Sequence, residues 1–310
     1  MRFFLPLPRL FLLVLLAFPL MVFAQKTAQK DLLESGILKA KLGDLKEALK
    51  ELNHAVEADT TVAEPYFNRG LVRSQLKDYK GAIRDFSKVT LLRPSLAEPY
   101  YNRGLAKDYL QDHKDAIRDY EKAILLKANY TEAYHNCGLA KYDMGEYAEA
   151  IKDFSRALQY KPDFTEAYYN RGLSRFNLND LSGAIQDFDQ SIKLDSSQYE
   201  YYSSRGAAKA AEGSYLEAVA DFSVAKALAP ADTNTRMNLA LAYLYLKDYR
   251  EALDEYDKIL EWSPGDAEAL ANRGVAKHYL SDKTGACEDW KLASEKGSEK
   301  AKSYLLKFCD

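Results

Sequence analysis

The sequence is poor in the residues that build catalytic and metal-binding sites. Its 310 residues include only three cysteines, four histidines and two tryptophans. Three cysteines are too few for a fold built on disulfides, and His54, His113, His135 and His278 show no metal-ligand spacing. No glycine-rich phosphate loop and no serine elbow occurs. We therefore expect a chain with no cofactor, no metal and no enzymatic activity.

Long apolar runs are also scarce, and the longest lies at the N-terminus. Arg2 and Arg9 precede an apolar stretch over residues 10–23, which falls short of the roughly 20 residues that a membrane-spanning helix needs. The segment Val22-Phe-Ala24 has the small-residue pattern of a cleavage site. We expect residues 1–24 to be a removed signal peptide, with no stable membrane span afterwards. The protein would then be exported, either periplasmic or secreted, and an uncleaved membrane anchor is the alternative.

What the sequence has in abundance is a period of 34 residues. We number the positions of each period from 1, starting at Gln29. Position 8 holds a glycine or, once, an alanine: Gly36, Gly70, Gly104, Gly138, Gly172, Gly206, Ala240 and Gly274. Position 20 is always alanine: Ala48, Ala82, Ala116, Ala150, Ala184, Ala218, Ala252 and Ala286. Position 24 is aromatic in all but the first period: Leu52, Phe86, Tyr120, Phe154, Phe188, Phe222, Tyr256 and Trp290.

Small residues at this spacing predict pairs of antiparallel helices. Position 8 in the first helix and position 20 in the second would let the two backbones approach closely, and the aromatic would fill the space beside them. One such hairpin is too thin to bury its own apolar face, so it must stack on its neighbours. Because the same positions recur in phase, we expect one continuous array of hairpins.

The pattern resembles a known repeat family. The string Ala63-Glu-Pro-Tyr-Phe-Asn-Arg-Gly70, continued by Ala82, Phe86 and Pro94, is similar to a tetratricopeptide repeat. The resemblance implies an all-α, right-handed superhelical solenoid of eight helix-turn-helix units with a capping helix at residues 301–310. The first unit, with leucines at positions 4 and 24, would be a divergent cap. The units are residues 29–62, 63–96, 97–130, 131–164, 165–198, 199–232, 233–266 and 267–300.

Charged residues at three positions of the period predict an internal ladder of ion pairs. Positions 7 and 23 are equidistant from the hairpin turn at position 15, so their side chains should meet across the helix pair. Position 11 could share the same carboxylates, and a charged binding strip is the alternative. Position 7 is arginine in Arg69, Arg103, Arg171, Arg205 and Arg273, and position 23 is acidic throughout: Glu51, Asp85, Asp119, Asp153, Asp187, Asp221, Glu255 and Asp289.

Two cysteines near the C-terminus are placed to face each other. Cys287 and Cys309 are centred on residue 298, beside Gly297, a natural helix stop. An exported protein meets oxidising conditions, in which these cysteines could form a disulfide that holds the last helix. The alternative is that they pack as two small apolar residues. Cys137 is expected to be buried.

The family resemblance also implies where a ligand would bind. In this family the first helices line a concave groove through positions 2, 5, 9, 12 and 13, with position 6 at its edge. Rings beside amides suit an extended peptide or a partner helix, although packing within the stack is the alternative role for both. The candidate residues, from the second to the fifth unit, are Phe67, Asn68, Tyr101, Asn102, Tyr109, His135, Asn136, Tyr142, Tyr169, Asn170 and Phe176.

We therefore predict an exported protein-interaction scaffold that binds a protein or peptide within the cell envelope. Position 2 is mostly glutamate, and this acidic rim should favour basic partners. A net charge of −3 without a basic stripe argues against nucleic acid. The alternatives are a structural component that assembles into homo-oligomers and an accessory subunit of a cell-envelope complex. The sequence does not name the partner.

Overall fold

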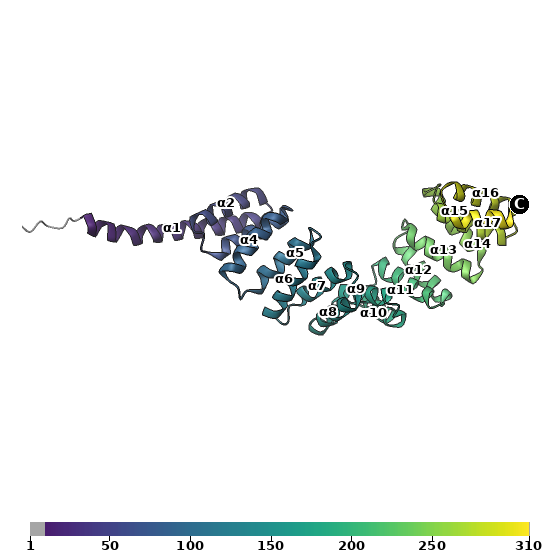
Figure 1. Ribbon diagram of the computed structural model, residues 1–310, viewed down its shortest axis with the longest axis horizontal. Coiled ribbons are helices and arrows are strands. Elements are labelled where there is room, and N and C mark those ends of the chain that lie inside the picture. Colours follow the sequence, from purple (N-terminus) through teal and green to yellow (C-terminus); the bar gives the residue numbers. More distant parts are fainter. Residues whose placement is uncertain (1–9, 310) are drawn as a thin grey trace, which may run out of the picture. The chain divides into compact units, whose positions relative to one another are not determined.

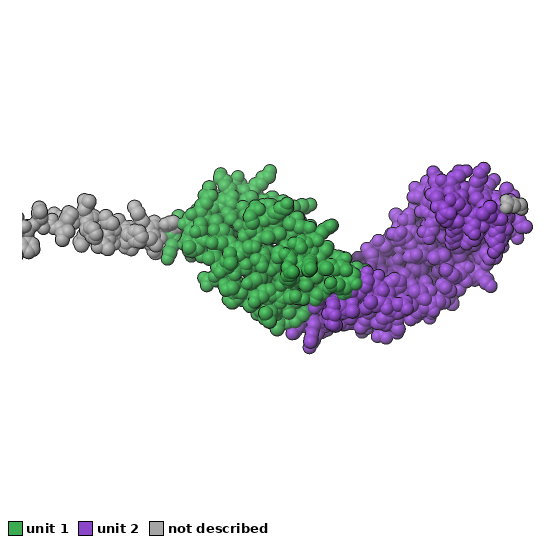
Figure 2. Space-filling view, viewed as in Figure 1, with its two compact units in different colours: residues 1–146 green, residues 147–310 purple. Residues whose placement is uncertain are grey.

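The computed structural model describes residues 10–309, with side chains from residue 26 onward. Over this range it contains seventeen α-helices and no strand, so the all-α prediction is confirmed (Figure 1). Residues 1–9 of the predicted signal peptide, residues 1–24, lie outside the described residues, and residues 10–24 belong to the first helix, where the backbone alone is described. The chain divides into two compact units, residues 1–146 and 147–310, each of which is described by itself (Figure 2).

Unit 1 is a stack of helical hairpins in which each helix packs against the next along the chain. Its first helix is longer than the predicted repeat, because it begins at Leu10 rather than near Gln29. The helices of unit 1 are α1 Leu10–Lys41, α2 Leu45–Ala58, α3 Ala63–Gln75, α4 Tyr79–Leu92, α5 Ala97–Asp108, α6 His113–Leu126 and α7 Thr131–Asp143.

Unit 2 repeats the same stacking and closes with an additional helix. Helices two apart also touch in this stack, as α11 and α13 do. The helices of unit 2 are α8 Tyr147–Tyr160, α9 Thr165–Asn177, α10 Leu181–Leu194, α11 Tyr199–Ala211, α12 Tyr215–Leu228, α13 Thr233–Leu246, α14 Tyr249–Trp262, α15 Ala267–Tyr279, α16 Lys283–Glu295 and α17 Glu299–Phe308.

The turn between the two helices of each hairpin has the same backbone conformation throughout. Position 15 has a positive φ in all eight periods, and aspartates at position 16, such as Asp78 and Asp180, cap the second helix by accepting a backbone N–H. Only three of the eight residues are glycine, although this conformation strains any residue with a Cβ. The position-15 residues are Gly43, Lys77, Gln111, Gly145, Asn179, Gly213, Lys247 and Ser281.

The strained turns predict a stabilising substitution. Lys247 has φ of 67°, and its replacement by glycine should raise the free energy of unfolding by about 1 kcal/mol, measured by chemical denaturation. Gly213 provides the matched control in the same unit, because a Cβ there would meet nothing within 4 Å. Gly213→Ala should therefore lose about 1 kcal/mol through backbone strain alone. Equal stabilities for wild type and Lys247→Gly would show that this turn is unstrained.

The glycine at position 8 makes room for a ring rather than for a second backbone. A Cβ added to Gly104 would lie 2.7 Å from Cε1 of Tyr120 and 3.3 Å from the carbonyl oxygen of Ala116. The same ring contact occurs between Gly172 and Phe188, at 2.7 Å. The nearest atoms therefore belong to the position-24 aromatic, which is fully buried, and the position-20 backbone comes second. Contacts of this kind make the aromatic the centre of each hairpin's core.

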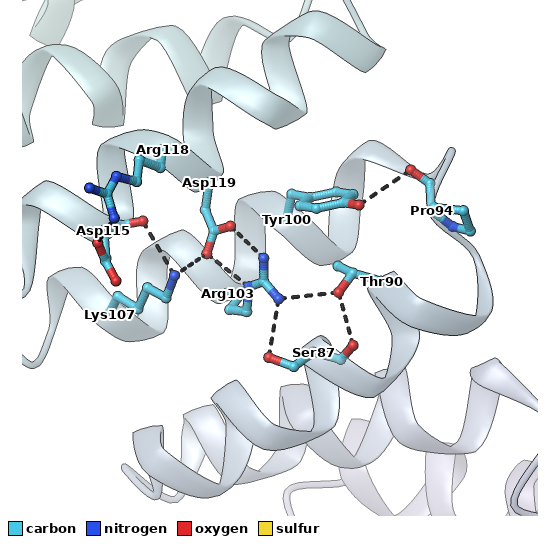
Figure 3. Close-up of polar contacts among 9 residues, drawn as sticks. All are labelled: Ser87, Thr90, Pro94, Tyr100, Arg103, Lys107, Asp115, Arg118 and Asp119. Atoms are coloured by element: carbon cyan, nitrogen blue, oxygen red, sulfur yellow. Dashed lines mark hydrogen bonds and ion pairs between the residues drawn. The ribbon is translucent and has the colours of Figure 1, made fainter.

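The predicted ladder of ion pairs is confirmed. All five position-7 arginines bind the position-23 carboxylate of their own repeat, with Nη2–Oδ1 distances of 2.5–2.7 Å. Arg103 is typical: its Nε and Nη2 each donate to Asp119, whose other neighbour is the Lys107 ammonium at 2.7 Å (Figure 3). The Asp119 side chain is only 6% exposed, whereas those of Arg103 and Lys107 are each 18% exposed. The ladder is therefore a partly buried structural element.

Each arginine also reaches back to the preceding repeat. Arg103 Nη1 donates to Oγ of Ser87 and to Oγ1 of Thr90, both on α4 (Figure 3). Arg69 donates to Asn53 in the same way, and Arg205 pairs with Asp189 at 2.6 Å. One guanidinium therefore joins the second helices of two successive hairpins.

The seventh period rearranges this contact. Leu239 replaces the arginine at position 7 and is fully buried. The position-23 carboxylate, Glu255, is instead paired at 2.5 Å with Arg236, at position 4, and with Lys226 of the preceding period. The Arg236 guanidinium also lies 5.2 Å from the ring centre of Trp262. The cation has moved by one helical turn, while the carboxylate keeps its place.

The last helix closes unit 2. A disulfide joins Cys287 on α16 to Cys309 at the end of α17, and Gly297, with φ of 96°, lies in the turn between these helices. Phe308 packs 4.6 Å from the ring of His278 and 5.8 Å from that of Trp290. The helix predicted at residues 301–310 begins at Glu299 in the structure.

Candidate functional site

The predicted groove residues of unit 1 are largely engaged within the stack. Tyr101 packs 4.8 Å from Tyr130 and 6.0 Å from Tyr120, and its hydroxyl accepts a hydrogen bond from Nδ2 of Asn136 at 2.9 Å. Burial is the main cause that raises the pKa of Tyr101, with the Glu132 carboxylate adding to it. Tyr101 and Asn136 therefore connect two repeats, and both side chains remain half-buried.

The asparagines of the second and third repeats bond their own helices. Nδ2 of Asn68 donates to the carbonyl oxygen of Glu64 at 2.9 Å, and Asn102 does the same to Glu98 at 2.8 Å. Each amide therefore bonds its own backbone, while its Oδ1 has no hydrogen-bond donor among residues 26–309, and Asn68 also lines a cavity in unit 1. His135 and Tyr142 lie on α7 and are half-buried.

Tyr109 is the predicted groove residue of unit 1 with the largest exposed surface, at 68%. It stacks on Tyr79 with ring centres 4.8 Å apart and planes 6° from parallel. Unit 2 has two more such pairs, Tyr215 with Tyr245 and Tyr249 with Tyr279. Each pair joins position 17 of one repeat to position 13 of the next. Tyrosines thirty residues apart in the sequence were the signal for these stacks, which sequence analysis missed.

The predicted groove residues of unit 2 also pack against neighbouring side chains of the stack. The ring of Tyr169 lies 5.8 Å from Phe188 and 4.8 Å from Tyr201, and its hydroxyl is 3.3 Å from Oγ of Ser204. Phe176 packs against the buried cluster that contains Phe188. Asn170 is half-buried, and its backbone carbonyl accepts from the hydroxyl of Ser174.

Cavities occur on the groove positions where position 12 is alanine. One lies in unit 1 beside Ala40, with a volume of about 210 Å³, and one in unit 2 beside Ala210, with about 360 Å³. Both are lined by positions 9, 12, 13 and 24 of one repeat and by positions 6, 9, 10 and 13 of the next. Larger residues at position 12, such as Phe176, pack inward instead. The sequence signal for each cavity is therefore a missing side chain.

The cavity in unit 2 contains an amide that is available for hydrogen bonding. Asn238 lines it, and its side chain forms no hydrogen bond among residues 26–309. In other repeats a position-5 tyrosine provides a hydroxyl near the following position 6, as Tyr169 does for Ser204. Here position 5 is Ser203, which is too short and accepts from Thr235 instead. The walls of this cavity are the stacked rings of Tyr215 and Tyr245.

A third cavity, of about 420 Å³, lies in unit 1 among α3, α4 and α5. Phe67, a predicted groove residue, forms part of its apolar lining together with Val89 and Leu96. Glu64 and Glu98, both at position 2, stand at its rim. Within residues 26–309, the position-2 glutamates form no ion pairs, and most are exposed.

Position 12 of the third repeat is polar. Asp108 lies 2.6 Å from Nδ1 of His113 and accepts a longer hydrogen bond, 3.4 Å, from the hydroxyl of Tyr120. Burial raises the pKa of Asp108, whereas the bond to His113 acts in the opposite direction.

Within residues 26–309, no group of three or more histidine, cysteine, aspartate or glutamate side chains is placed to bind a metal ion. In the described part of the chain, no helix combines the length and apolarity needed to span a membrane.

Family models match several of the repeats. Tetratricopeptide-repeat models match residues 63–96, 97–130 and 165–198, a further one matches residues 234–266, and a TPR-repeat model matches residues 138–179. The chain carries tetratricopeptide repeats. These matches place the recurrent glycine, alanine and aromatic positions in a fold that serves protein interaction. The count of eight repeats stays a prediction.

Solved tetratricopeptide-repeat structures share the fold. MamA is 27% identical, with a TM-score of 0.51, over 52% of this chain and 94% of that one. YrrB, described as a TPR protein with an unusual peptide-binding site, is 21% identical with a TM-score of 0.55, over 59% and 95% of the two chains. PilF of Pseudomonas aeruginosa is 19% identical with a TM-score of 0.57, over 67% and 94%. No curated protein matches the sequence.

Proposed function

We propose that this chain is an exported, non-enzymatic scaffold that holds a protein or peptide partner in the groove lined by the first helices of its repeats. The pattern of residues 1–24 supports export, to the periplasm or the exterior. Tetratricopeptide repeats support interaction rather than catalysis. The description of YrrB as a peptide-binding protein is consistent with a polypeptide partner.

The observation that carries this proposal is the pair of cavities on the groove positions. Each is lined mainly by apolar side chains, most of them on first helices, and the one charged residue in either lining is Lys41 in unit 1. Apolar cavities with a few polar groups are typical of ligand sites. In unit 2 the amide of Asn238 could pair with the backbone of an extended segment, while the tyrosine rings supply contact area.

Filling the cavities tests the proposal. A displayed library of random twelve-residue peptides is selected on the mature chain, residues 25–310, and the synthetic peptides are titrated against Ala40→Tyr and Ala210→Tyr. Position 12 already holds Tyr142 in another repeat, so these variants should fold. We expect at least one filled variant to bind at least tenfold more weakly, because the ring occupies the ligand's space.

The matched control places the same ring outside the groove. Leu216 lies on a second helix, is 74% exposed, and lines neither cavity, so Leu216→Tyr should bind as the wild type does. A selection that yields no binding peptide would reject a peptide-binding function. Peptides whose affinity is the same for all variants would place their site outside these cavities.

A further inference from the structure

The cavity at Phe67 lies where two other repeats bury a ring of their own chain. In the third repeat, Tyr130 packs 4.8 Å from Tyr101 at an interplanar angle of 40°. In unit 2, Tyr201 packs 4.8 Å from Tyr169 at 45°. Tyr130 and Tyr201 are each only 8% exposed. Both rings are therefore buried directly beside the position-5 ring.

Phe67 is the equivalent position-5 ring of the second repeat. It lies 5.8 Å from the core ring of Phe86, as Tyr169 does from Phe188. The second ring, however, is missing. Tyr130 corresponds in the period to Leu96, and Tyr201 corresponds to Pro99. Both of these shorter residues line the 420 Å³ cavity, and Leu96 is 44% exposed.

A cation also covers this space in other repeats. Nζ of Lys127, at position 31, lies 4.4 Å from the ring centre of Tyr130, and Lys161 lies 4.7 Å from that of Phe164. Position 31 of the second repeat is Arg93, which lines the cavity. The Arg93 side chain has no ion pair, hydrogen bond or ring contact among residues 26–309. A ring in the cavity could therefore lie between Phe67 and the Arg93 guanidinium, in contact with both.

The charged residues around the cavity favour a partner with a positive charge. Glu64 and Glu98 line the cavity, both are exposed, and neither is paired with a cation within residues 26–309. Together with Arg93 they leave one net negative charge. A basic residue beside the inserted ring would meet an unpaired carboxylate, whereas an acidic neighbour would be repelled.

We propose that this cavity binds an aromatic side chain of the partner polypeptide, with a lysine or arginine adjacent to it. The inference rests on the proposed peptide-binding function and specifies one anchor of the bound segment. The contacts that the chain makes with its own Tyr130 and Tyr201 would be reproduced between Phe67 and a ring of the partner.

The arrangement in the third repeat, where Tyr130 packs beside Tyr101, suggests a test of this proposal. Leu96→Tyr introduces a ring at the position that Tyr130 occupies, so the chain would fill its own cavity without loss of stability. The control is Leu91→Tyr, which adds the same residue to an exposed site on α4 that does not line the cavity; Leu91 is 79% exposed. Peptides from the displayed library are titrated against the mature chain and both variants by fluorescence anisotropy.

We expect the selected peptides to share an aromatic residue beside a lysine or arginine. They should bind Leu96→Tyr at least tenfold more weakly than wild type and bind Leu91→Tyr within twofold of it. Replacement of the peptide's aromatic residue by leucine should weaken binding to wild type but not to Leu96→Tyr. Arg93→Gln should weaken binding about threefold, as the loss of an exposed cation–π contact predicts.

The other outcomes separate this inference from the function on which it rests. Peptides that bind Leu96→Tyr as tightly as wild type would overturn the aromatic anchor while leaving peptide binding in place. Selected peptides without a shared aromatic residue would overturn it as well. A library that yields no binding peptide would reject both the anchor and the proposed function.

Discussion

Asp187→Ala is expected to lower the free energy of unfolding by about 3 kcal/mol, measured by chemical denaturation. The Asp187 side chain is only 3% exposed, and it binds Arg171 at 2.6 Å and Arg175 at 2.8 Å. Its removal would leave the partly buried Arg171 without a counter-charge and Arg175 with only the more distant Asp180, at 3.7 Å. Breaking such a pair from one side costs more than the pair itself contributes, because the remaining charge stays desolvated.

Two further variants separate this effect from the ordinary cost of losing an ion pair. Lys258 and Glu261 form an exposed pair on α14 at 2.8 Å, and Glu261→Ala should cost less than about 0.5 kcal/mol. Adding Arg171→Leu to Asp187→Ala should recover part of the lost stability, since it removes one unpaired cation. The chain already has a leucine at this position in Leu239. Similar losses for Asp187→Ala and Glu261→Ala would show that the ladder is solvated like a surface pair.

Loss of the disulfide should have an effect of similar size, confined to the end of unit 2. The bridge from Cys287 to Cys309 spans 22 residues, and a loop of this length predicts about 3 kcal/mol of stabilisation in the chain-entropy model. We expect Cys309→Ser to lower the melting temperature and to speed amide hydrogen exchange in α17, while exchange in α11 stays the same. Hydrogen exchange with mass spectrometry resolves the two helices.

Reduction provides the internal control for this variant. Dithiothreitol should shift the wild type to the melting temperature of Cys309→Ser and leave the variant itself unaffected. The helix also has contacts that survive reduction: Ala301 is fully buried, and Nζ of Lys300 donates to Oδ1 of Asn272 at 2.9 Å. An unchanged melting temperature on reduction would mean that these contacts alone hold α17.

The sequence predicted best those features that depend on spacing. The arginine ladder follows from the symmetry of positions 7 and 23 about the turn, and each arginine found its carboxylate sixteen residues away. The hairpin turn predicted at position 15 also lies there in the structure, but its positive φ in residues such as Lys77 and Gln111 was not predicted. Periodic contacts could be predicted because equivalent positions pack in the same way in successive repeats.

The candidate site was harder to predict because it depends on differences between repeats. Large aromatic residues looked like ligand contacts, yet Tyr101 and Phe176 pack within the stack. The cavities lie instead where a side chain is shorter than its counterparts, as Leu96 is compared with Tyr130. Resemblance to the family described the shared positions and not these departures. The boundary between the two compact units, after residue 146, could not be predicted from the sequence either, because the 34-residue period continues across it.

Phe308 has a consequence for the length of the array. It lies 34 residues after Gly274, so α17 corresponds to the first helix of a ninth repeat with phenylalanine at position 8. A second helix could not pack there as in the other repeats, because position 8 elsewhere holds only glycine or, in Ala240, alanine; in the last repeat even a Cβ on Gly274 would lie 2.4 Å from Nε1 of Trp290. Packing a further second helix against α17 in the same way would therefore require a smaller residue in place of Phe308. Phe308 therefore restricts how another helix can stack on α17.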